Sequence, residues 1–289
     1  MNYFWIALGF ILLAPLEGGL LTGIDRIISA RFQGRVGPPL LQPFYDVLKL
    51  LQKENTIVTS SQNFYILGFL IFIIITGVLF FCGVDILLVI FVLTLASIFL
   101  VLGGYSTHSP YSYIGAEREL LLMMSYEPMV LLTAIGIFMA TGSFSLEDII
   151  SNPNPIHVIA FLPGVFIGFV YVLIIKFRKS PFDLSMSHHA HQELVRGITT
   201  EFTGKTLAMI EIAHWYENIF LLGIVYLFFA FNPILGLFMT LAVYFLSIVV
   251  DNVSARFKWQ LVFKSSWLIA GVLGITNIVV LYVLKMGWK

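Results

Sequence analysis

The sequence has few charged residues and a single cysteine. Only 11% of its 289 residues are charged, against about 25% in soluble domains, so a soluble protein of this size would lack polar side chains to cover its surface. One cysteine, Cys82, cannot hold an iron–sulfur cluster or a zinc site and cannot form an internal disulfide. A redox centre that this protein serves must therefore lie on another chain, unless a non-covalent organic cofactor binds here.

Charge of either sign is also not in excess, because 16 basic residues balance 16 acidic ones. Without a basic surplus, nucleic-acid binding has no support. The N-terminus lacks the basic region of a cleavable signal peptide. The residues that are abundant are apolar, at 59% of the chain with a mean hydropathy of +0.95. This composition predicts an integral membrane protein and excludes a soluble enzyme.

Apolar stretches long enough to cross a bilayer recur along the chain. A spanning helix needs about 20 apolar residues, and eight segments meet this requirement: 3–23, 64–83, 86–105, 120–140, 156–176, 211–230, 233–250 and 267–284. The connections near Asp85 and Asn232 are short, so the helices that they join form antiparallel hairpins. We expect an all-α, polytopic membrane protein in which residues 1–289 form a single membrane domain.

Lys and Arg are concentrated in alternate connections between these spans. The segments 24–63, 105–119, 176–210 and 251–266 hold 14 of the 16 basic residues, and the other three connections hold none. Membrane proteins keep an excess of Lys and Arg in their cytoplasmic loops. The pattern therefore predicts that these four connections face the cytoplasm and that both termini face outward.

The first basic connection, 24–63, carries an amphipathic helix. Pro43 suits a first helical turn, and apolar residues recur at helical spacing at Leu40, Leu41, Phe44, Val47, Leu48 and Leu51. We expect a short helix at the membrane surface between the first two spans. It either anchors the loop or forms a docking platform for a peripheral subunit, and the three arginines of the segment favour the platform.

The segment 176–210 concentrates histidines. His188, His189 and His191 fall within four residues, and Glu193 follows them. Three interpretations are open: a zinc site shared by His188 and His191, a proton-exchanging cluster, or a hydrogen-bonded polar loop beneath a partner protein. The polar loop is favoured, because no fourth zinc ligand with the spacing of a known motif is present.

Acidic residues lie in or beside the apolar spans, although each charge costs about 2.5–3.5 kcal/mol there on insertion scales. Because Glu211, His214 and Glu217 are three residues apart, they share one face of a helix. We favour a proton path or charge-coupling chain over a static network that holds helices together. The candidates are Glu17, Glu117, Glu119, Glu127, Glu211, His214 and Glu217, with Arg118 as a neutralising cation and Tyr126 and Tyr216 as relay hydroxyls.

Three motifs, in order along the chain, resemble a known family. They are Asp25-Arg26 with Ala30-Arg31-Phe32-Gln33-Gly34-Arg35-Val36-Gly37-Pro38-Pro39, Leu41-Gln42-Pro43, Asp46 and Lys49; residues 115–119 with Ser125-Tyr126-Glu127-Pro128; and residues 179–184 with Glu193 and 201–204. The motifs resemble the H-type membrane subunit of NADH–quinone oxidoreductase (complex I). They resemble more closely the equivalent membrane subunit of energy-converting nickel–iron hydrogenases. This family also has eight core spans.

Differences from the complex I pattern favour the hydrogenase branch. Pro38-Pro39 leads almost directly to Leu41-Gln42, and methionine stands at positions 123 and 124, where complex I relatives usually have a glutamine. The segment after Asp183-Leu184 is longer and rich in histidine, as in the Ech and related membrane-bound hydrogenases. Because these loops line the quinone cavity in complex I, their divergence argues against quinone binding.

The resemblance implies a membrane anchor and coupling subunit with no cofactor and no catalytic residue of its own. Ferredoxin-dependent proton reduction, which evolves hydrogen, would drive H+ or Na+ translocation. The partners would be peripheral large and small hydrogenase subunits and an iron–sulfur subunit, which carry the nickel–iron centre and the clusters, together with an antiporter-like membrane subunit. The alternatives are the H-type membrane subunit of complex I, a related quinone- or sulfur-reducing complex, and a stand-alone ion transporter.

Particular residues take on expected roles from this resemblance. Glu117, Glu119, Glu127 and Glu201 match the family motifs by position, whereas Glu211, His214 and Glu217 are candidates because we expect them to be buried. The peripheral arm would dock on 24–63 and 176–210, through Arg26, Arg31, Arg35, Gln42, Asp46, Lys49, Asp183, His188, His189, His191, Glu193, Arg196 and Glu201.

Overall fold

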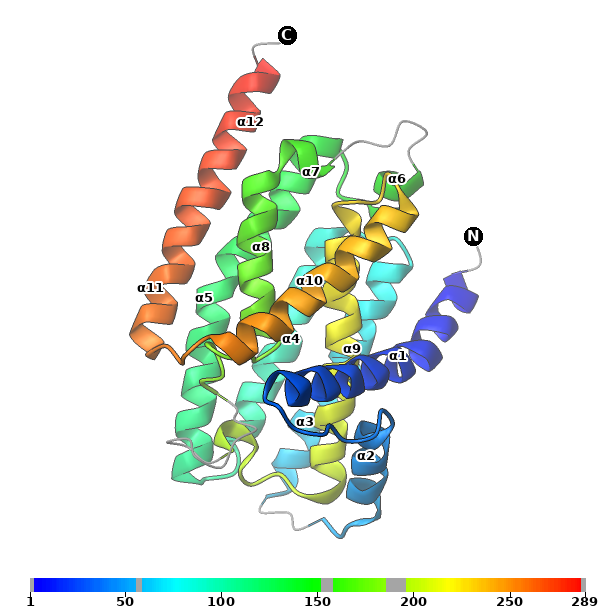
Figure 1. The fold of residues 1–289 in the computed structure, drawn as a ribbon, viewed down its shortest axis with the longest axis vertical. Helices are drawn as coiled ribbons and strands as arrows, with labels where there is room; N and C mark the ends of the chain where they lie inside the picture. Colours follow the sequence, from blue (N-terminus) through cyan, green and yellow to red (C-terminus); the bar gives the residue numbers. More distant parts are fainter. Residues whose placement is uncertain (1–2, 56–58, 152–157, 186–195, 287–289) are drawn as a thin grey trace.

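The computed structural model describes residues 3–55, 59–151, 158–185 and 196–286, which fold almost entirely into helices (Figure 1). The elements are α1 (Tyr3–Phe32), α2 (Gln42–Gln52), α3 (Ser60–Phe81), α4 (Ile86–Tyr105), α5 (Pro110–Thr141), α6 (Leu146–Ser151), α7 (Val158–Phe161), α8 (Pro163–Lys176), the 3-10 turn η1 (Gly197–Thr199), α9 (Gly204–Leu227), α10 (Pro233–Val253), α11 (Trp259–Ile269), the π-helical segment η2 (Ala270–Ile275) and α12 (Thr276–Met286). The predicted all-α membrane fold is confirmed.

In the described part of the chain, seven helices are long and apolar enough to cross a membrane: α1, α3, α4, α5, α9, α10 and the continuous helix Trp259–Leu284. The predicted span 156–176 is not among these seven, because the helix is interrupted at Leu162 and α8, which follows, has only 14 residues. The backbone of Leu162 is not helical, at φ −125° and ψ 43°, as expected for a residue that precedes proline.

Several spanning helices continue beyond their predicted limits. The prediction ends the first span at residue 23, whereas α1 continues to Phe32 and contains Arg26 and Arg31. It begins the fourth span at 120 and the sixth at 211, whereas α5 begins at Pro110 and α9 at Gly204. Apolar runs end where charged residues begin, but the helices continue past them, and three of these charges are paired: Arg26 with Asp46 of α2, Glu119 with Arg178, and Asp25 with Lys179.

The bundle is centred on α3, α4, α5 and α9, and α1 crosses its surface obliquely (Figure 1). Two glycines allow other backbone segments to approach closely. A Cβ on Gly18 of α1 would lie 2.6 Å from the carbonyl oxygen of Trp215 of α9. A Cβ on Gly115 of α5 would lie 2.2 Å from the backbone nitrogen of Ile198, so η1 rests directly on α5.

The short helix α2 lies beside α1 and α9 and has two different faces (Figure 1). Pro43 and Val47 are buried, and the ring centroid of Phe44 lies 5.2 Å from that of Trp215. The polar residues Lys49 and Gln52 are exposed, as is Leu48, which the prediction placed on the apolar side. This arrangement confirms the predicted amphipathic helix between the first two spans.

The C-terminal helix is fastened to the interruption between α7 and α8 by Asn277. Its side-chain oxygen accepts hydrogen bonds from the backbone N–H groups of Gly164 (2.7 Å) and Val165 (3.1 Å), and its Nδ2 donates to the carbonyl oxygen of Phe161 (3.0 Å). Asn277 therefore satisfies backbone groups that a helix start leaves without intrahelical partners.

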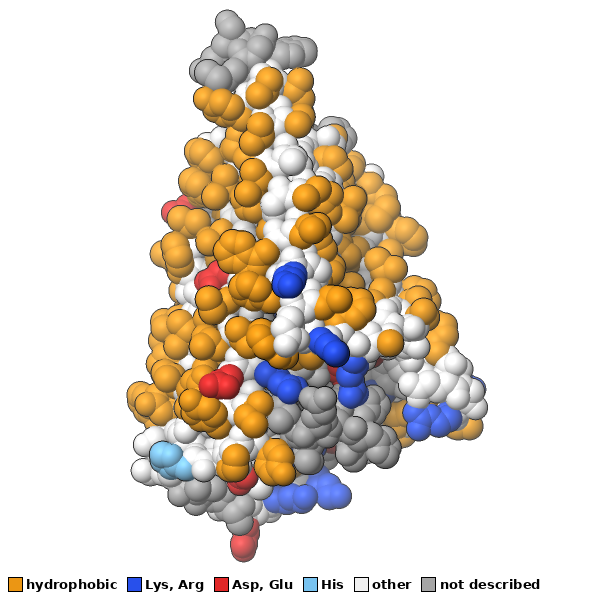
Figure 2. All heavy atoms as spheres, turned by 90° about the vertical axis from the view of Figure 1, so that its left-hand side faces the viewer, with side chains coloured by type: hydrophobic (Ala, Val, Ile, Leu, Met, Phe, Trp, Pro, Cys, Tyr) orange, Lys and Arg blue, Asp and Glu red, His pale blue; other side chains and the backbone are white. Residues whose placement is uncertain are grey.

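The face that carries α11 and α12 is apolar over most of its height, and basic side chains gather in its lower part (Figure 2). Its exposed apolar residues include Trp267, Leu268, Val272, Ile275, Val279, Val280, Val283 and Leu284. An apolar surface of this height, bordered by Lys and Arg, suits a protein whose sides contact lipid.

Candidate functional site

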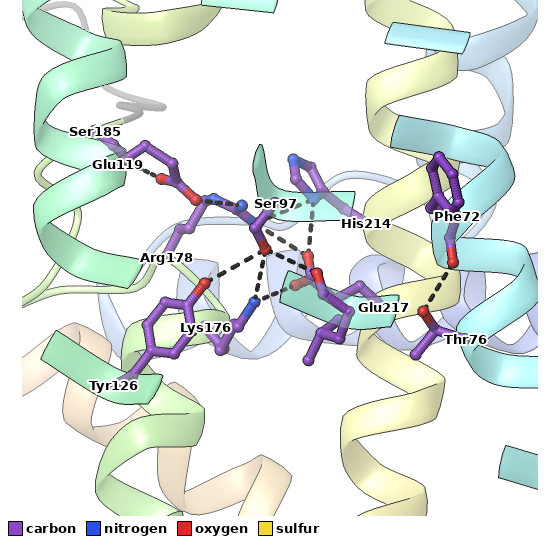
Figure 3. Close-up of polar contacts among 11 residues, drawn as sticks. Phe72, Thr76, Ser97, Glu119, Tyr126, Lys176, Arg178, Ser185, His214 and Glu217 are labelled. Atoms are coloured by element: carbon purple, nitrogen blue, oxygen red, sulfur yellow. Dashed lines mark hydrogen bonds and ion pairs between the residues drawn. The ribbon is translucent and has the colours of Figure 1, made fainter. Parts of the chain in front are cut away.

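A buried cluster of charged side chains lies where α4, α5, α9 and the end of α8 meet (Figure 3). It consists of Glu119 from α5, Lys176 at the end of α8, Arg178 just beyond it, and His214 and Glu217 from α9. Ser97, Tyr126 and Ser185 add further hydrogen bonds to it. Four separate parts of the sequence therefore meet at one polar site inside an apolar bundle.

Arg178 joins the two acids of this cluster. Its Nη2 lies 2.8 Å from Oε1 of Glu119, and its Nη1 lies 3.3 Å from Oε2 of Glu217. Lys176 Nζ lies 3.1 Å from the other oxygen, Oε1, of Glu217. These side chains are at most 8% exposed, and buried charges are tolerated only when they are paired in this way.

The surroundings of Lys176 are polar on one side and aromatic on the other. Its Nζ donates to Ser97 Oγ at 3.3 Å and lies 4.3 Å from the ring centroid of Tyr126. The Tyr126 hydroxyl donates to the same serine oxygen at 3.4 Å. The predicted relay role of Tyr126 is thus compatible with its position. Tyr216 instead donates to the backbone oxygen of Ile11 at 2.6 Å.

His214 lies between Arg178 and Glu217. Its Nδ1 is 3.1 Å from Arg178 Nη1 and 3.3 Å from Glu217 Oε2. A neutral ring with its proton on Nε2 accepts from Arg178, whereas a protonated ring donates to Glu217. Because Nδ1 cannot do both, the position of the proton on the ring decides which group His214 binds.

A polar cavity of about 480 Å³ adjoins the cluster. Lys176, Arg178 and His214 line it. Arg26 and Arg196 line it as well and are exposed, so the cavity opens at the protein surface. Its other charged lining residues are Asp25, Lys179, Asp183, Glu211 and Asp251. The buried His214 Nε2 has no hydrogen-bond partner among the described residues, so a water molecule in the cavity could exchange a proton with this ring.

Two charged groups outside the spanning segments have perturbed pKa values. Burial alone would lower the pKa of Arg178, but the neighbouring Glu119 and Glu217 outweigh burial and raise it. Arg178 is therefore a permanent positive charge. Burial would raise the pKa of Asp46, but hydrogen bonds from Arg26 and Gln42 lower it.

The predicted proton-path residues fall into four groups in the structure. Glu119, Glu217 and His214 belong to the cluster, and Glu211 lines the cavity. Glu127 is half-buried on α5 and has no hydrogen bond or ion pair with a described residue. Glu17 and Glu117 are exposed.

The prediction missed the two cations of the cluster. It places Lys176 and Arg178 in a cytoplasmic loop, yet both are buried and pair with acids. One sequence feature could have indicated that Lys176 is buried: it is the last residue of an apolar run. The sequence suggested Arg118 as a neutralising cation for Glu117 or Glu119, and the cation that pairs with Glu119 in the structure is Arg178.

The predicted docking residues lie near α2 and the cavity. Arg26 Nη1 is 2.6 Å from Asp46 Oδ2, and Gln42 donates to Asp46 Oδ1 at 2.9 Å. Asp183 pairs with Arg256 at 2.9 Å. The other predicted docking residues that the structure describes are exposed or half-buried: Arg31, Arg35, Lys49, Arg196 and Glu201. His188, His189, His191 and Glu193 lie outside the described residues. In the described ranges no group of three His, Cys, Asp or Glu side chains could hold a metal.

Comparison with known proteins gives consistent matches. A sequence profile of the family described as NADH dehydrogenase matches residues 5–282. The H-type subunit of NADH-quinone oxidoreductase from Bacillus cytotoxicus is 31% identical over 245 residues, which are 77% of this chain and 72% of that protein. Hydrogenase-4 component C of Escherichia coli is 28% identical over 281 residues, 86% of this chain and 87% of that protein. A chain of the membrane-bound sulfane sulfur reductase, an archaeal respiratory membrane complex, superposes with a TM-score of 0.84 at 27% identity, covering 96% of this chain and 100% of that one.

Proposed function

This chain belongs to the NADH dehydrogenase family, and from that premise we propose that it is the membrane anchor and coupling subunit of an energy-converting hydrogenase. It is a membrane subunit of a respiratory complex related to complex I, and we propose that this complex is a hydrogenase. In this role it links ferredoxin-dependent proton reduction on a peripheral arm to the movement of H+ or Na+ across the membrane.

The length of the match to hydrogenase-4 component C favours a hydrogenase over complex I. That match takes in 86% of this chain and 87% of the relative, against 77% and 72% for the Bacillus oxidoreductase subunit. The structural similarity to the sulfane sulfur reductase chain supports a second candidate, a sulfur-reducing complex. Complex I itself and a stand-alone transporter are the further alternatives.

The observation that carries the coupling role is the buried ion-pair cluster beside a polar cavity that reaches the surface. A proton that enters the cavity can bind Nε2 of a His214 ring whose Nδ1 already donates to Glu217. The ring then carries a positive charge and takes over Glu217 from Arg178. Because Arg178 holds both Glu217 and Glu119, this exchange redistributes charge from α9 to α5. Lys176 is the second cation through which Glu217 is held.

The orientation and the docking surface follow the distribution of basic residues. We place the end of the bundle that carries α2 and the cavity in the cytoplasm of a prokaryotic cell, with both termini outside, as the excess of Lys and Arg at that end favours (Figure 2). The peripheral subunits, which would carry the nickel–iron centre and iron–sulfur clusters, dock on 24–63 and 176–210. An antiporter-like membrane subunit completes the path of the ion.

Purification of the complex from its native membranes in a mild detergent tests this proposal. We expect nickel by metal analysis and hydrogen evolution when reduced ferredoxin is added. A complex without nickel would exclude the hydrogenase. Reduction of a sulfane sulfur substrate by the same preparation would then establish the second candidate. Ion transport by this chain alone in liposomes would favour the transporter.

A further inference from the structure

Two residues that follow α8 contact Glu119 directly. Arg178 forms an ion pair with this acid, and the hydroxyl of Ser185 donates to its other oxygen, Oε2 (Figure 3). Ser185 is buried, at 1% exposure. The connection between α8 and α9 therefore supplies both a charge and a neutral hydrogen-bond donor to one buried carboxylate.

The backbone of Ser185 is tied to the other end of the same connection. Its carbonyl oxygen accepts a hydrogen bond from the N–H of Ile198 at 2.9 Å. The carbonyl oxygen of Ile198 in turn accepts from Ser112 Oγ at 3.1 Å, and Gly115 leaves no room between Ile198 and α5. Ser112, Gly115 and Glu119 are all buried on one face of α5. The two ends of the connection thus meet on the helix that carries the acid.

We infer that Ser185 is a positioning residue that transmits displacement of this connection to the buried ion pairs. The inference rests on the proposed function, in which a peripheral subunit docks on 176–210. When the connection shifts, the Ser185 hydroxyl leaves Glu119, whose second oxygen then has no described donor. Glu119 draws Arg178 more strongly, and Arg178 withdraws from Glu217. Ser185 transfers no proton and acts by changing which acid Arg178 neutralises.

The chain offers a matched control in Ser112. Ser112→Ala removes a buried hydroxyl that holds the same connection, through Ile198, but touches no acid. Ser185→Ala removes a hydroxyl that touches Glu119. A merely structural role predicts equal effects of the two substitutions, whereas the positioning role predicts that Ser185→Ala alone separates electron transfer from ion movement.

The test uses inverted vesicles that contain the full complex, with reduced ferredoxin as donor. Hydrogen evolution reports electron transfer, while internal acidification and uptake of radioactive sodium report ion movement. We expect Ser185→Ala to keep electron transfer and to lose most of the ion movement, with a shifted pH profile for coupled turnover. Ser112→Ala keeps both activities. Adding Ser185→Ala to Glu119→Gln changes nothing further, because the carboxylate that Ser185 serves is gone.

The isosteric pair Ser185→Thr and Ser185→Val covers the case in which the alanine variant fails to assemble. We expect the Thr variant, which keeps the hydroxyl, to retain coupling and the Val variant, which lacks it, to lose coupling. Equal coupling in both variants overturns the inference. Normal coupling in Ser185→Ala, or an equal loss in Ser112→Ala, also overturns it. If Glu119→Gln itself leaves ion movement intact, the proposed function of the cluster fails as well, so the two failures are distinguishable.

Discussion

Removal of one charge from the buried cluster tests whether its ion pairs carry the stability of the bundle interior. Lys176→Met leaves two carboxylates, Glu119 and Glu217, to share the single guanidinium of Arg178. Both members of the Lys176–Glu217 pair are 2% exposed, so water cannot replace the lost partner. Breaking a buried pair by removing one side costs about 3–5 kcal/mol. At about 2–4 °C for each kcal/mol in chains of 150–250 residues, we expect the variant to leave the purified complex at a temperature about 6–20 °C lower than the unsubstituted chain does.

The double variant Lys176→Met/Glu217→Gln distinguishes electrostatics from packing. It restores charge balance while leaving the pair of Arg178 and Glu119, so we expect it to be more stable than either single variant. Native gels of the heated complex, probed for this subunit, give the midpoints. Lys264→Met, which removes a lysine on α11 outside the cluster, is the control and should not shift the midpoint. If the two single effects simply add in the double variant, the reasoning is refuted, because interacting charges cannot give additive losses.

The remaining predictions concern single residues. Gly115→Ala should weaken assembly by about 1–3 kcal/mol through overpacking against η1, whereas Gly9→Ala, which has open space around it, should be neutral; native gels compare the two, and equal loss would contradict the packing argument. Asn277→Ala should cost about 0.5–2 kcal/mol, as for other helix caps, and should raise hydrogen exchange at the start of α8. The lowered pKa of Asp46 means that its ion pair with Arg26 stabilises α2 fully above the ordinary Asp pKa and is lost as pH falls through the lowered value. Because the pair is well exposed, it contributes about 0.2–1 kcal/mol to the stability of α2. Asp46→Asn should therefore abolish the pH dependence of protease cleavage at α2. Glu211→Gln should slow ion movement without slowing electron transfer in vesicles; unchanged ion movement would remove Glu211 from the path.

Much of the fold follows from the sequence because spanning helices depend on long apolar runs. The amphipathic α2 also follows, since its spacing of apolar residues is local information. The interruption at Leu162 was missed, although Pro163 was visible, because proline can also lie within a spanning helix when neighbours supply hydrogen bonds. Here the neighbour is Asn277, which lies far along the chain in the last helix.

The site was only partly predictable for a similar reason. Helical spacing correctly grouped His214 with Glu217, because both lie on one helix face. Spacing could not place Glu119 beside Arg178, since that contact depends on how α5 packs against the end of α8. Lys176 and Arg178 were assigned to a solvated loop by a rule about charge at membrane surfaces, which does not distinguish a basic residue that faces water from one that turns inward.

The sum of charges in the cluster constrains how it can work. Lys176 and Arg178 supply two positive charges, and Glu119 and Glu217 supply two negative ones, so the resting site is electroneutral with a neutral imidazole. A proton added to His214 leaves one uncompensated positive charge in a medium that tolerates it poorly. Relief requires that a cation depart or that an electron arrive nearby. Under the proposed coupling role, uptake on one side and release on the other are tied together by this need for neutrality, without any large displacement of helices.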